Sequence, residues 1–353
     1  MMWEYLFKRF LKNFRKGGVD VNARSVLHLT ALDLVVTENV DHYGDTSHIR
    51  VLLEHGTLVN RENFEESSTL ARAFESEDVE ILQTLVKYAT DLGNLNENKR
   101  TALHELFFGQ LNDTNDYIMI IEQFCKKGID IDCQDSRKQT PLHTAVANGS
   151  DDGITALLAC GADLNMIDSN KCTPFSMLMS DIDDMDLREL SSDLKQRISI
   201  MARHVRKMQA FKLKVVRQNA LLESQYTEMC ESSDDDAEGP QHDELKKMKG
   251  IVLRENLTLQ DIMYIDSSQL VSQELIDELK SVSSLDDFHT KFPELGGILK
   301  LKLRIAQRKK AISLARKSLF LIFRMQIPET CTEIIACCLS DTDLKTVVDM
   351  MLQ

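Results

Sequence analysis

The chain has 353 residues, of which 43% are hydrophobic and 28% charged, so it can form about two domains and is not disordered throughout. Its five prolines and fourteen glycines favour helices over a sandwich of short strands. Its formal net charge of −14 opposes binding to nucleic acid and is more compatible with a basic protein partner.

The cysteines and the apolar runs exclude two further classes of protein. Eight cysteines are scattered along the chain without a Cys-x-x-Cys pair, which favours reduced thiols in the cytoplasm or nucleus over a disulfide framework. No run of 18 apolar residues occurs, so we expect no membrane-spanning helix.

The first 14 residues form an amphipathic stretch in which Trp3 and Phe7 share a helical stripe with other apolar residues. Charged residues interrupt the stripe, so it is not the core of a signal peptide. We interpret it as a helix that packs on the next element, and a helix on a membrane surface is the alternative.

An internal repeat organises the first half of the chain. The clearest unit, residues 135–165, contains Thr140-Pro141-Leu142-His143-Thr144-Ala145 and closes with Gly161-Ala162-Asp163-Leu164-Asn165. Similar openings begin at positions 30, 68, 101, 140 and 173, at spacings of 38, 33, 39 and 33 residues. The closing positions have the same spacings, at Gly18, Gly56, Ala89, Gly128 and Gly161. Two markers that share an irregular period establish a genuine repeat.

This motif resembles the ankyrin repeat, in which Thr and Pro open a first helix and a left-handed Gly ends a second. The resemblance implies an all-α solenoid of helix-turn-helix units with hairpin loops over residues 1–180, with an N-terminal half-repeat and about five units, the last one degenerate. At His104 and His143 it implies a structural hydrogen bond between neighbouring loops rather than a metal or catalytic site.

Two units are longer than the others. Their extra residues, 37–47 and 109–116, are rich in Asp, Asn, Thr and Gly, so we expect longer loops between paired helices. These loops are either tolerated surface variation or parts that shape a partner site.

Stacked repeats bury a continuous core and leave their hairpin tips and inner helices to a ligand. By resemblance, ankyrin arrays bind other proteins. The tip residues that we expect to contact the target are Asn63, Asn96, Arg100, Arg137, Lys138, Asn170 and Lys171.

The repeat pattern ends near residue 180. Residues 181–225 predict a helical extension with a basic cluster between Arg203 and Arg217, which we interpret as a solvated helix face, with nucleic-acid binding as the alternative. Residues 226–246 are acidic and predict a flexible linker. Residues 247–353 predict a helical C-terminal domain, in which a long amphipathic helix begins at Ile298 and ends before Pro328.

The last hundred residues resemble the PRANC domain, which follows ankyrin repeats in poxvirus and parasitoid-wasp proteins. The resemblance rests on Phe292-Pro293, Gly296-Gly297, the basic amphipathic helix, Ile327-Pro328-Glu329, Ile334-Ile335, Leu339-Ser340 and Asp343-Leu344. PRANC domains resemble a truncated F-box, which docks its helices on the Skp adaptor subunit of a cullin-RING ubiquitin ligase.

The resemblance implies an apolar docking surface for the Skp subunit, made of Ile327, Pro328, Ile334, Ile335, Leu339 and Leu344. Four residues depart from the family pattern, and each loss of contact area costs about 1 kcal/mol. These are Thr330, Cys331, Ala336 and Cys338. The alternative is that the apolar positions close a local helical core.

The sequence therefore predicts an adaptor that binds a target protein through its array and recruits a ubiquitin ligase through its C-terminal domain. The alternative is a stoichiometric inhibitor or decoy, similar to the ankyrin inhibitors of Rel-type (NF-κB) transcription factors, which needs the array alone. No phosphate-binding loop, nucleophile elbow or His/Cys cluster with the spacing of a metal site occurs in the sequence. We therefore expect no enzymatic activity, no bound cofactor and no metal site. We expect a monomer outside its complexes, with no nucleic-acid or membrane partner.

Overall fold

The chain divides into two compact units in the computed structural model. Unit 1 comprises residues 1–202 and 217–226, and unit 2 comprises residues 203–216 and 227–353. The structure describes residues 20–24, 29–38, 46–59, 69–75, 79–89, 98–109, 111, 113–180, 190–229, 239–254, 257–265 and 288–322, and also residues 335, 336, 339, 344, 346 and 347. The N-terminal stripe of residues 1–14 lies outside this part of the chain.

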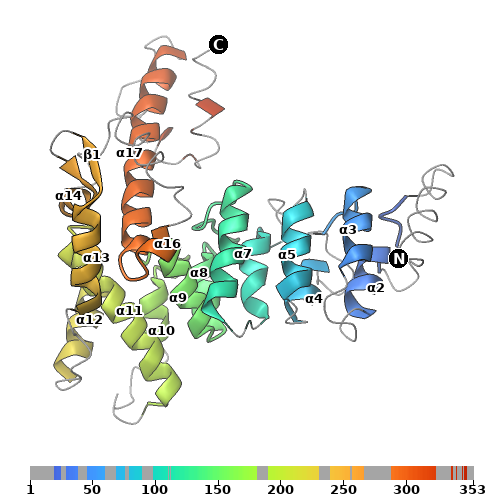
Figure 1. Ribbon diagram of the computed structural model, residues 1–353, viewed down its shortest axis with the longest axis horizontal. Coiled ribbons are helices and arrows are strands. Elements are labelled where there is room, and N and C mark those ends of the chain that lie inside the picture. The colour runs from blue at the N-terminus through green and yellow to red at the C-terminus, as the bar shows by residue number, and fades with distance from the viewer. Residues whose placement is uncertain are drawn as a thin grey trace. The chain divides into compact units, whose positions relative to one another are not determined.

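Unit 1 is a stack of helix pairs (Figure 1). The pairs are α2 (Ala31–Glu38) with α3 (Ser47–Glu54), α4 (Thr69–Glu75) with α5 (Val79–Tyr88), α6 (Ala102–Glu105) and the 3-10 turn η2 (Leu106–Phe108) with α7 (Thr114–Lys126), and α8 (Pro141–Ala147) with α9 (Asp151–Ala159). Helix α10 (Pro174–Ser180) follows. First helices contact first helices in the order α2, α4, α6 and η2, α8, α10, and second helices contact second helices in the order α3, α5, α7, α9. This order confirms the predicted solenoid.

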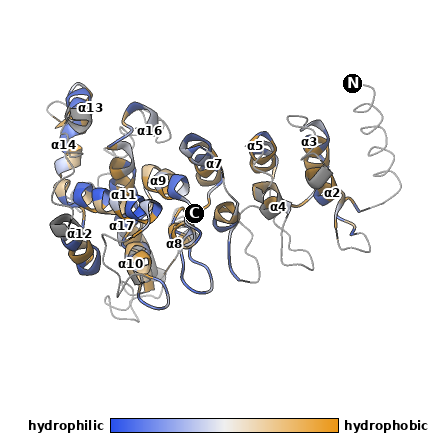
Figure 2. Cartoon of the chain, turned by 90° about the horizontal axis from the view of Figure 1, so that it is seen from below, coloured by the Kyte–Doolittle hydropathy of each residue, from blue (hydrophilic) through white to orange (hydrophobic). Residues whose placement is uncertain are grey.

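The repeat motif determines the core of the stack. Its leucine position is completely buried in four successive units, at Leu32, Leu70, Leu103 and Leu142. Figure 2 shows hydrophobic residues along the stacked helices, whereas the tips of the loops between α7 and α8 and between α9 and α10 are hydrophilic. Because each unit buries this leucine against its neighbours, the core continues from one repeat to the next.

Glycines end the second helices as the motif predicts. Gly56, Gly128 and Gly161 follow α3, α7 and α9 with φ of 87°, 88° and 88°, in the left-handed region that glycine tolerates best. The amide of Gly128 donates to the Cys125 carbonyl at 2.9 Å, so the turn also satisfies one of the last carbonyls of α7.

The longer loop between η2 and α7 is held by one tyrosine. The completely buried ring of Tyr117 stacks on Phe107, with centroids 5.7 Å apart and an interplanar angle of 12°. Its hydroxyl accepts hydrogen bonds from the Leu111 amide at 3.0 Å and from the Ser150 Oγ at 3.1 Å. This insertion is therefore anchored to its own repeat and to the next one. Most of the other insertion, residues 39–45, lies outside the described residues.

Replacing Tyr117 with Phe should lower the free energy of unfolding of unit 1 by about 1–2 kcal/mol, because the buried Leu111 amide loses its acceptor while the ring stack remains. Urea unfolding followed by circular dichroism measures this change. The matched control is Tyr88→Phe at the half-buried end of α5. Equal stability of the Tyr117→Phe and Tyr88→Phe variants would show that the hydroxyl does not hold the loop.

Two later helices contribute to unit 1 beyond the repeats. They are α11 (Ser192–Ala210) and α12 (Arg217–Met229), whose first parts fall within this unit. The completely buried Asn219 donates from Nδ2 to the Leu164 carbonyl at 3.0 Å, and its Oδ1 accepts from the Thr173 hydroxyl at 2.6 Å. Residues of the predicted helical extension 181–225 thus close the last hairpin of the array.

Unit 2 is mainly helical. Its described elements include α13 (Gly239–Lys249), α14 (Leu259–Tyr264), α16 (Phe288–Lys291) and α17 (Gly296–Ile322). The sequence did not predict its small hairpin, in which β1 (Val252–Arg254) pairs antiparallel with β2 (Leu257–Thr258). Helix α13 begins inside segment 226–246, so the end of the predicted linker is helical in the structure. Within the described residues, no helix is long and apolar enough to span a membrane.

Polar contacts inside unit 2 fix the start of α17. The buried Nζ of Lys302 donates to the carbonyls of Phe211 at 3.0 Å and Met263 at 2.5 Å. Lys207, which belongs to the predicted basic cluster, forms an ion pair with Glu294. At least one charge of that cluster therefore has an acidic partner inside the protein.

Candidate binding surface at the hairpin tips

In four of the opening motifs, a polar side chain at the fourth position caps the first helix of its repeat. Each accepts a hydrogen bond from the backbone amide of the threonine that precedes the helix, at 2.8 to 3.2 Å. The four side chains are Asp33, His104, His143 and Ser176. Three kinds of side chain thus satisfy the backbone amide at the same motif position, which explains why the motif survives where the histidine is absent.

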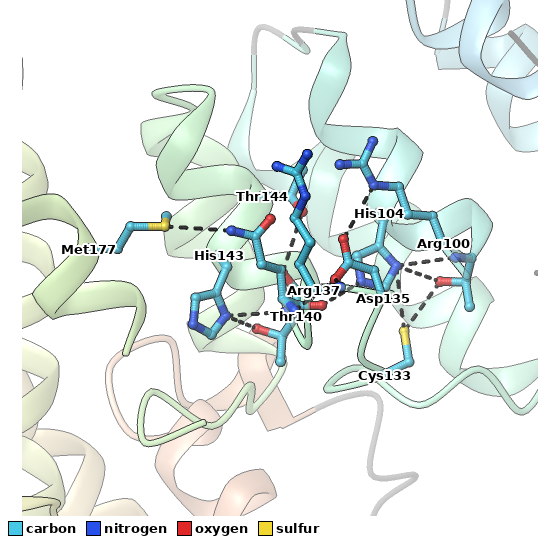
Figure 3. A network of polar contacts seen from close by, with 11 residues as sticks. Arg100, His104, Cys133, Asp135, Arg137, Thr140, His143, Thr144 and Met177 are labelled. Atoms are coloured by element: carbon cyan, nitrogen blue, oxygen red, sulfur yellow. Dashed lines mark hydrogen bonds and ion pairs between the residues drawn. The ribbon is translucent and has the colours of Figure 1, made fainter. Parts of the chain in front are cut away.

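Both motif histidines also reach the next hairpin. His104 Nε2 donates to the Gln139 carbonyl at 3.1 Å, and His143 Nε2 donates to the Cys172 carbonyl at 3.1 Å. Figure 3 shows the other nitrogen of the His143 ring in contact with Thr140. Because Nδ1 accepts and Nε2 donates, each ring is neutral. Burial is the main cause that lowers both pKa values, that of His104 to about 4. The predicted structural role of these histidines is confirmed.

The turns of two successive hairpins are each built on a buried aspartate. Asp135 Oδ1 accepts from the amides of Arg137 and Gln139, both at 2.8 Å. Asp168 Oδ1 accepts in the same way from the amides of Asn170 at 2.8 Å and Cys172 at 2.9 Å. Repeating this arrangement gives successive hairpins the same shape.

Neighbouring hairpin tips are joined through their main chains. The Ser136 amide donates to the Asn98 carbonyl at 2.8 Å, and the Ser169 amide donates to the Arg137 carbonyl at 2.8 Å. We call residues 98–99, 136–138 and 169–171 the tip row. These bonds hold the three tips side by side, so the tip row is a preorganised surface.

The structure places four of the predicted contact residues on the tip row with exposed side chains. They are Arg137, Lys138, Asn170 and Lys171. Arg100 is different, because its Nε lies 3.5 Å from an Asp135 carboxylate oxygen and its guanidinium carbon lies 4.9 Å from the centre of the Phe108 ring. Its partly exposed side chain therefore also contacts the array itself. Asn63 and Asn96 lie outside the described residues.

The sequence prediction missed Lys99. Lys99, Lys138 and Lys171 occupy equivalent positions, with φ of 57°, 57° and 65°, and all three side chains are exposed. The signal was present in the sequence, because these lysines are separated by 39 and 33 residues, which are spacings of the repeat itself.

Metal binding and thiol reactivity both depend on how the His, Cys, Asp and Glu side chains of the described residues lie. No group of three or more His, Cys, Asp or Glu side chains that could hold a metal ion occurs within the part of the chain that the structure describes. Cys125, Cys133, Cys160 and Cys172, all in this part, are not joined by disulfides. Burial is the main cause that raises the pKa of Cys133 to about 12, so this thiol stays protonated and unreactive.

The predicted docking residues of the C-terminal domain differ in exposure. Leu344 is completely buried in a small core with Ala315 and Ala336, and Leu339 packs against this core. Ile335, by contrast, is 39% exposed. The other three predicted residues, Ile327, Pro328 and Ile334, lie outside the described residues.

Comparisons with known proteins agree with this geometry. The family model described as ankyrin repeats (3 copies) matches residues 70–168. A protein of Fowlpox virus (strain NVSL), named as an ankyrin repeat protein, is 33% identical over 138 residues, which cover 33% of this chain and 19% of the relative. This chain therefore spans about a fifth of the length of that relative.

Among solved structures, the ankyrin repeat domain of Bcl-3, described as a member of the IκB protein family, is 21% identical with a TM-score of 0.42. The match covers 56% of this chain and 78% of the Bcl-3 chain. The family match lies on the stacked helix pairs and includes the motif histidines and the Asp135 turn. Residues 70–168 therefore match ankyrin repeats both in sequence and in the order of their stacked helices.

Proposed function

We propose that the chain is a non-catalytic adaptor whose array, residues 1–180, holds a target protein at the tip row. The supporting observation is that main-chain hydrogen bonds join three successive tips, which carry exposed polar and cationic side chains. A surface that is already ordered loses little conformational entropy on binding, so more of the contact energy contributes to affinity.

Site-specific photo-crosslinking of the full chain tests this proposal. A photoreactive amino acid replaces Arg137 or Asn170 on the tip row, or the exposed Lys126 at the end of α7 as the control. We expect the same cellular protein to be crosslinked from both tip positions and not from the control. Crosslinking that is equal at all three positions, or absent at the tips, would contradict target binding by the tip row.

We propose further that the C-terminal domain, residues 247–353, recruits the Skp subunit of a cullin-RING ligase, with ubiquitin transferred by other subunits. This proposal rests on the resemblance to the PRANC domain, and the exposure of Ile335 supports it because docking needs an apolar side chain that a partner can cover. The buried Leu344 would act by shaping the core beneath it. The proposal requires a compartment that holds such ligases, which is the cytoplasm or nucleus.

Two exposed apolar residues of unit 2 allow a matched test of ligase recruitment. Ile335 and Leu314 are each 39% exposed, and only Ile335 belongs to the predicted docking set. We expect Ile335→Asp to weaken binding of purified Skp subunit to the full chain about tenfold or more, because an apolar contact is lost, whereas Leu314→Asp keeps the affinity.

The same pair of variants separates the adaptor from the alternative, a stoichiometric inhibitor that needs the array alone. An adaptor with Ile335→Asp would still bind the target but would no longer promote its degradation. If both variants bound the Skp subunit as the unchanged chain does, docking through Ile335 would be refuted. If the target stayed at the same level with and without the protein, the inhibitor would be favoured.

A further inference from the structure

Three lysines of the tip row stand in a backbone conformation that suits glycine. The φ angles of Lys99, Lys138 and Lys171 lie between 57° and 65°. In this left-handed region the Cβ of an L residue is crowded by the following carbonyl, which costs free energy that glycine does not lose. The side chain that stands there in three successive hairpins is therefore maintained against a conformational cost.

The same repeats use glycine where only the backbone matters. At the ends of the second helices, Gly56, Gly128 and Gly161 adopt φ of 87° to 88°. The repeat thus has two positions with a left-handed backbone conformation, and glycine stands at one of them and lysine at the other. A residue held in an unfavourable conformation points to a function of its side chain.

The charge of these lysines is directed outward. All three are exposed, and Arg137, next to Lys138, is exposed as well. The two carboxylates that build the turns, Asp135 and Asp168, are buried and bind backbone amides. The tip row is therefore a line of cationic side chains within a chain of net charge −14.

The local charge of the tip row determines what can bind there. At an ionic strength of 0.1 M, charges more than about 10 Å apart are largely screened, so a segment on the tips interacts mainly with the nearby lysines. A long polyanion such as nucleic acid would extend beyond the tips and be repelled by the acidic chain. A short acidic segment avoids this repulsion.

We propose that Lys99, Lys138 and Lys171 bind an acidic segment of the target protein, one lysine from each tip. This inference rests on the proposed function and specifies the chemistry of the partner at that same surface. It also revises the expectation of a basic partner, which followed from the net charge alone.

The experiment measures the binding of a fluorescent peptide of alternating Glu and Ser to the full chain by fluorescence anisotropy. The main variant changes Lys99, Lys138 and Lys171 together to Gly, and a second variant changes all three to Arg. The control changes Lys87, Lys126 and Lys195, which are exposed residues of unit 1, to Gln and removes the same charge.

We expect the Gly variant to bind the peptide about tenfold more weakly and the Arg variant to bind it unchanged, because exposed ion pairs contribute modestly but add over three sites. The Gly variant should also melt about 3–6 °C higher, because its backbone is relieved of strain. A purely structural role of the lysines does not predict higher stability together with weaker binding.

Equal binding by the Gly variant and the unchanged chain, or an equal loss in the Gln control, would overturn the inference. Stronger binding of an oligothymidylate than of the Glu peptide would overturn it too. If the peptide result fails while crosslinks from Arg137 and Asn170 still capture a target, the acidic-segment inference is wrong and the proposed function stands. If those crosslinks also fail, the proposed function is wrong.

Discussion

Lowering the pH from 7 to 4 should reduce the free energy of unfolding of the array by about 3 kcal/mol through His104 alone. In the folded chain the ring accepts from the Thr101 amide and donates to the Gln139 carbonyl, which requires the neutral form. Burial lowers its pKa from 6.5 to about 4. Between these values the unfolded chain binds a proton that the folded chain does not, so stability falls as the pH falls.

The test compares urea unfolding of the unchanged chain and of His104→Gln at several pH values from 7 to 4. Carboxylates titrate in the same range, so the informative quantity is the difference in pH dependence between the two proteins. The variant should be less stable at pH 7 and lose less stability on acidification. Parallel pH curves would show that His104 titrates in the folded chain as it does in the unfolded chain.

Replacing Gly109 with Ala should destabilise the array by about 3 kcal/mol, at the upper end of the usual cost of overpacking. A Cβ at this position would lie 2.2 Å from the Phe74 carbonyl oxygen and 2.5 Å from its carbonyl carbon. The obstacle is backbone of helix α4, and the Phe74 side chain is itself buried, so neither can move aside at low cost.

Gly128→Ala is the matched control, because nothing lies within 4 Å of its added Cβ. Its φ of 88° makes alanine unfavourable by about 1 kcal/mol, so the control measures the conformational cost without the clash. Thermal unfolding of both variants gives the comparison. A Gly109→Ala protein at least as stable as the control would mean that the loop after η2 does not lie against α4.

The repeat motifs allowed most of unit 1 to be predicted, because cap, leucine and glycine positions depend on residues close in sequence. No comparable pattern predicts contacts between positions that are distant in the sequence. Arg100, a predicted contact residue, also contacts Asp135 of the next hairpin and the Phe108 ring, and the sequence did not predict these contacts. The Asn219 side chain donates to the carbonyl of Leu164, which lies 55 residues earlier, and no local sequence pattern predicts such a pair.

The less regular C-terminal part was harder to predict for the same reason. Its helices were expected from periodicity, whereas the β1–β2 hairpin is too short for an alternating pattern to stand out. Lys302 lies within the long helix, and helical periodicity does not predict that a lysine there is buried. Its two carbonyl partners come from other segments of unit 2, and only their approach makes a buried ammonium tolerable.

The interleaved division of the chain limits how it can be dissected. The backbone passes from one unit to the other after Ala202, returns at Arg217 and leaves again after Tyr226. A fragment that stops at residue 180 lacks Asn219 and leaves the carbonyl of Leu164 and the hydroxyl of Thr173 without it. A single cut anywhere from residue 203 to residue 226 separates parts of one unit from the rest of it. The N-terminal and C-terminal parts of this protein therefore cannot be exchanged independently of each other. A chimera that replaces one part must keep residues 190–229 together with the rest of the unit to which each of their segments belongs.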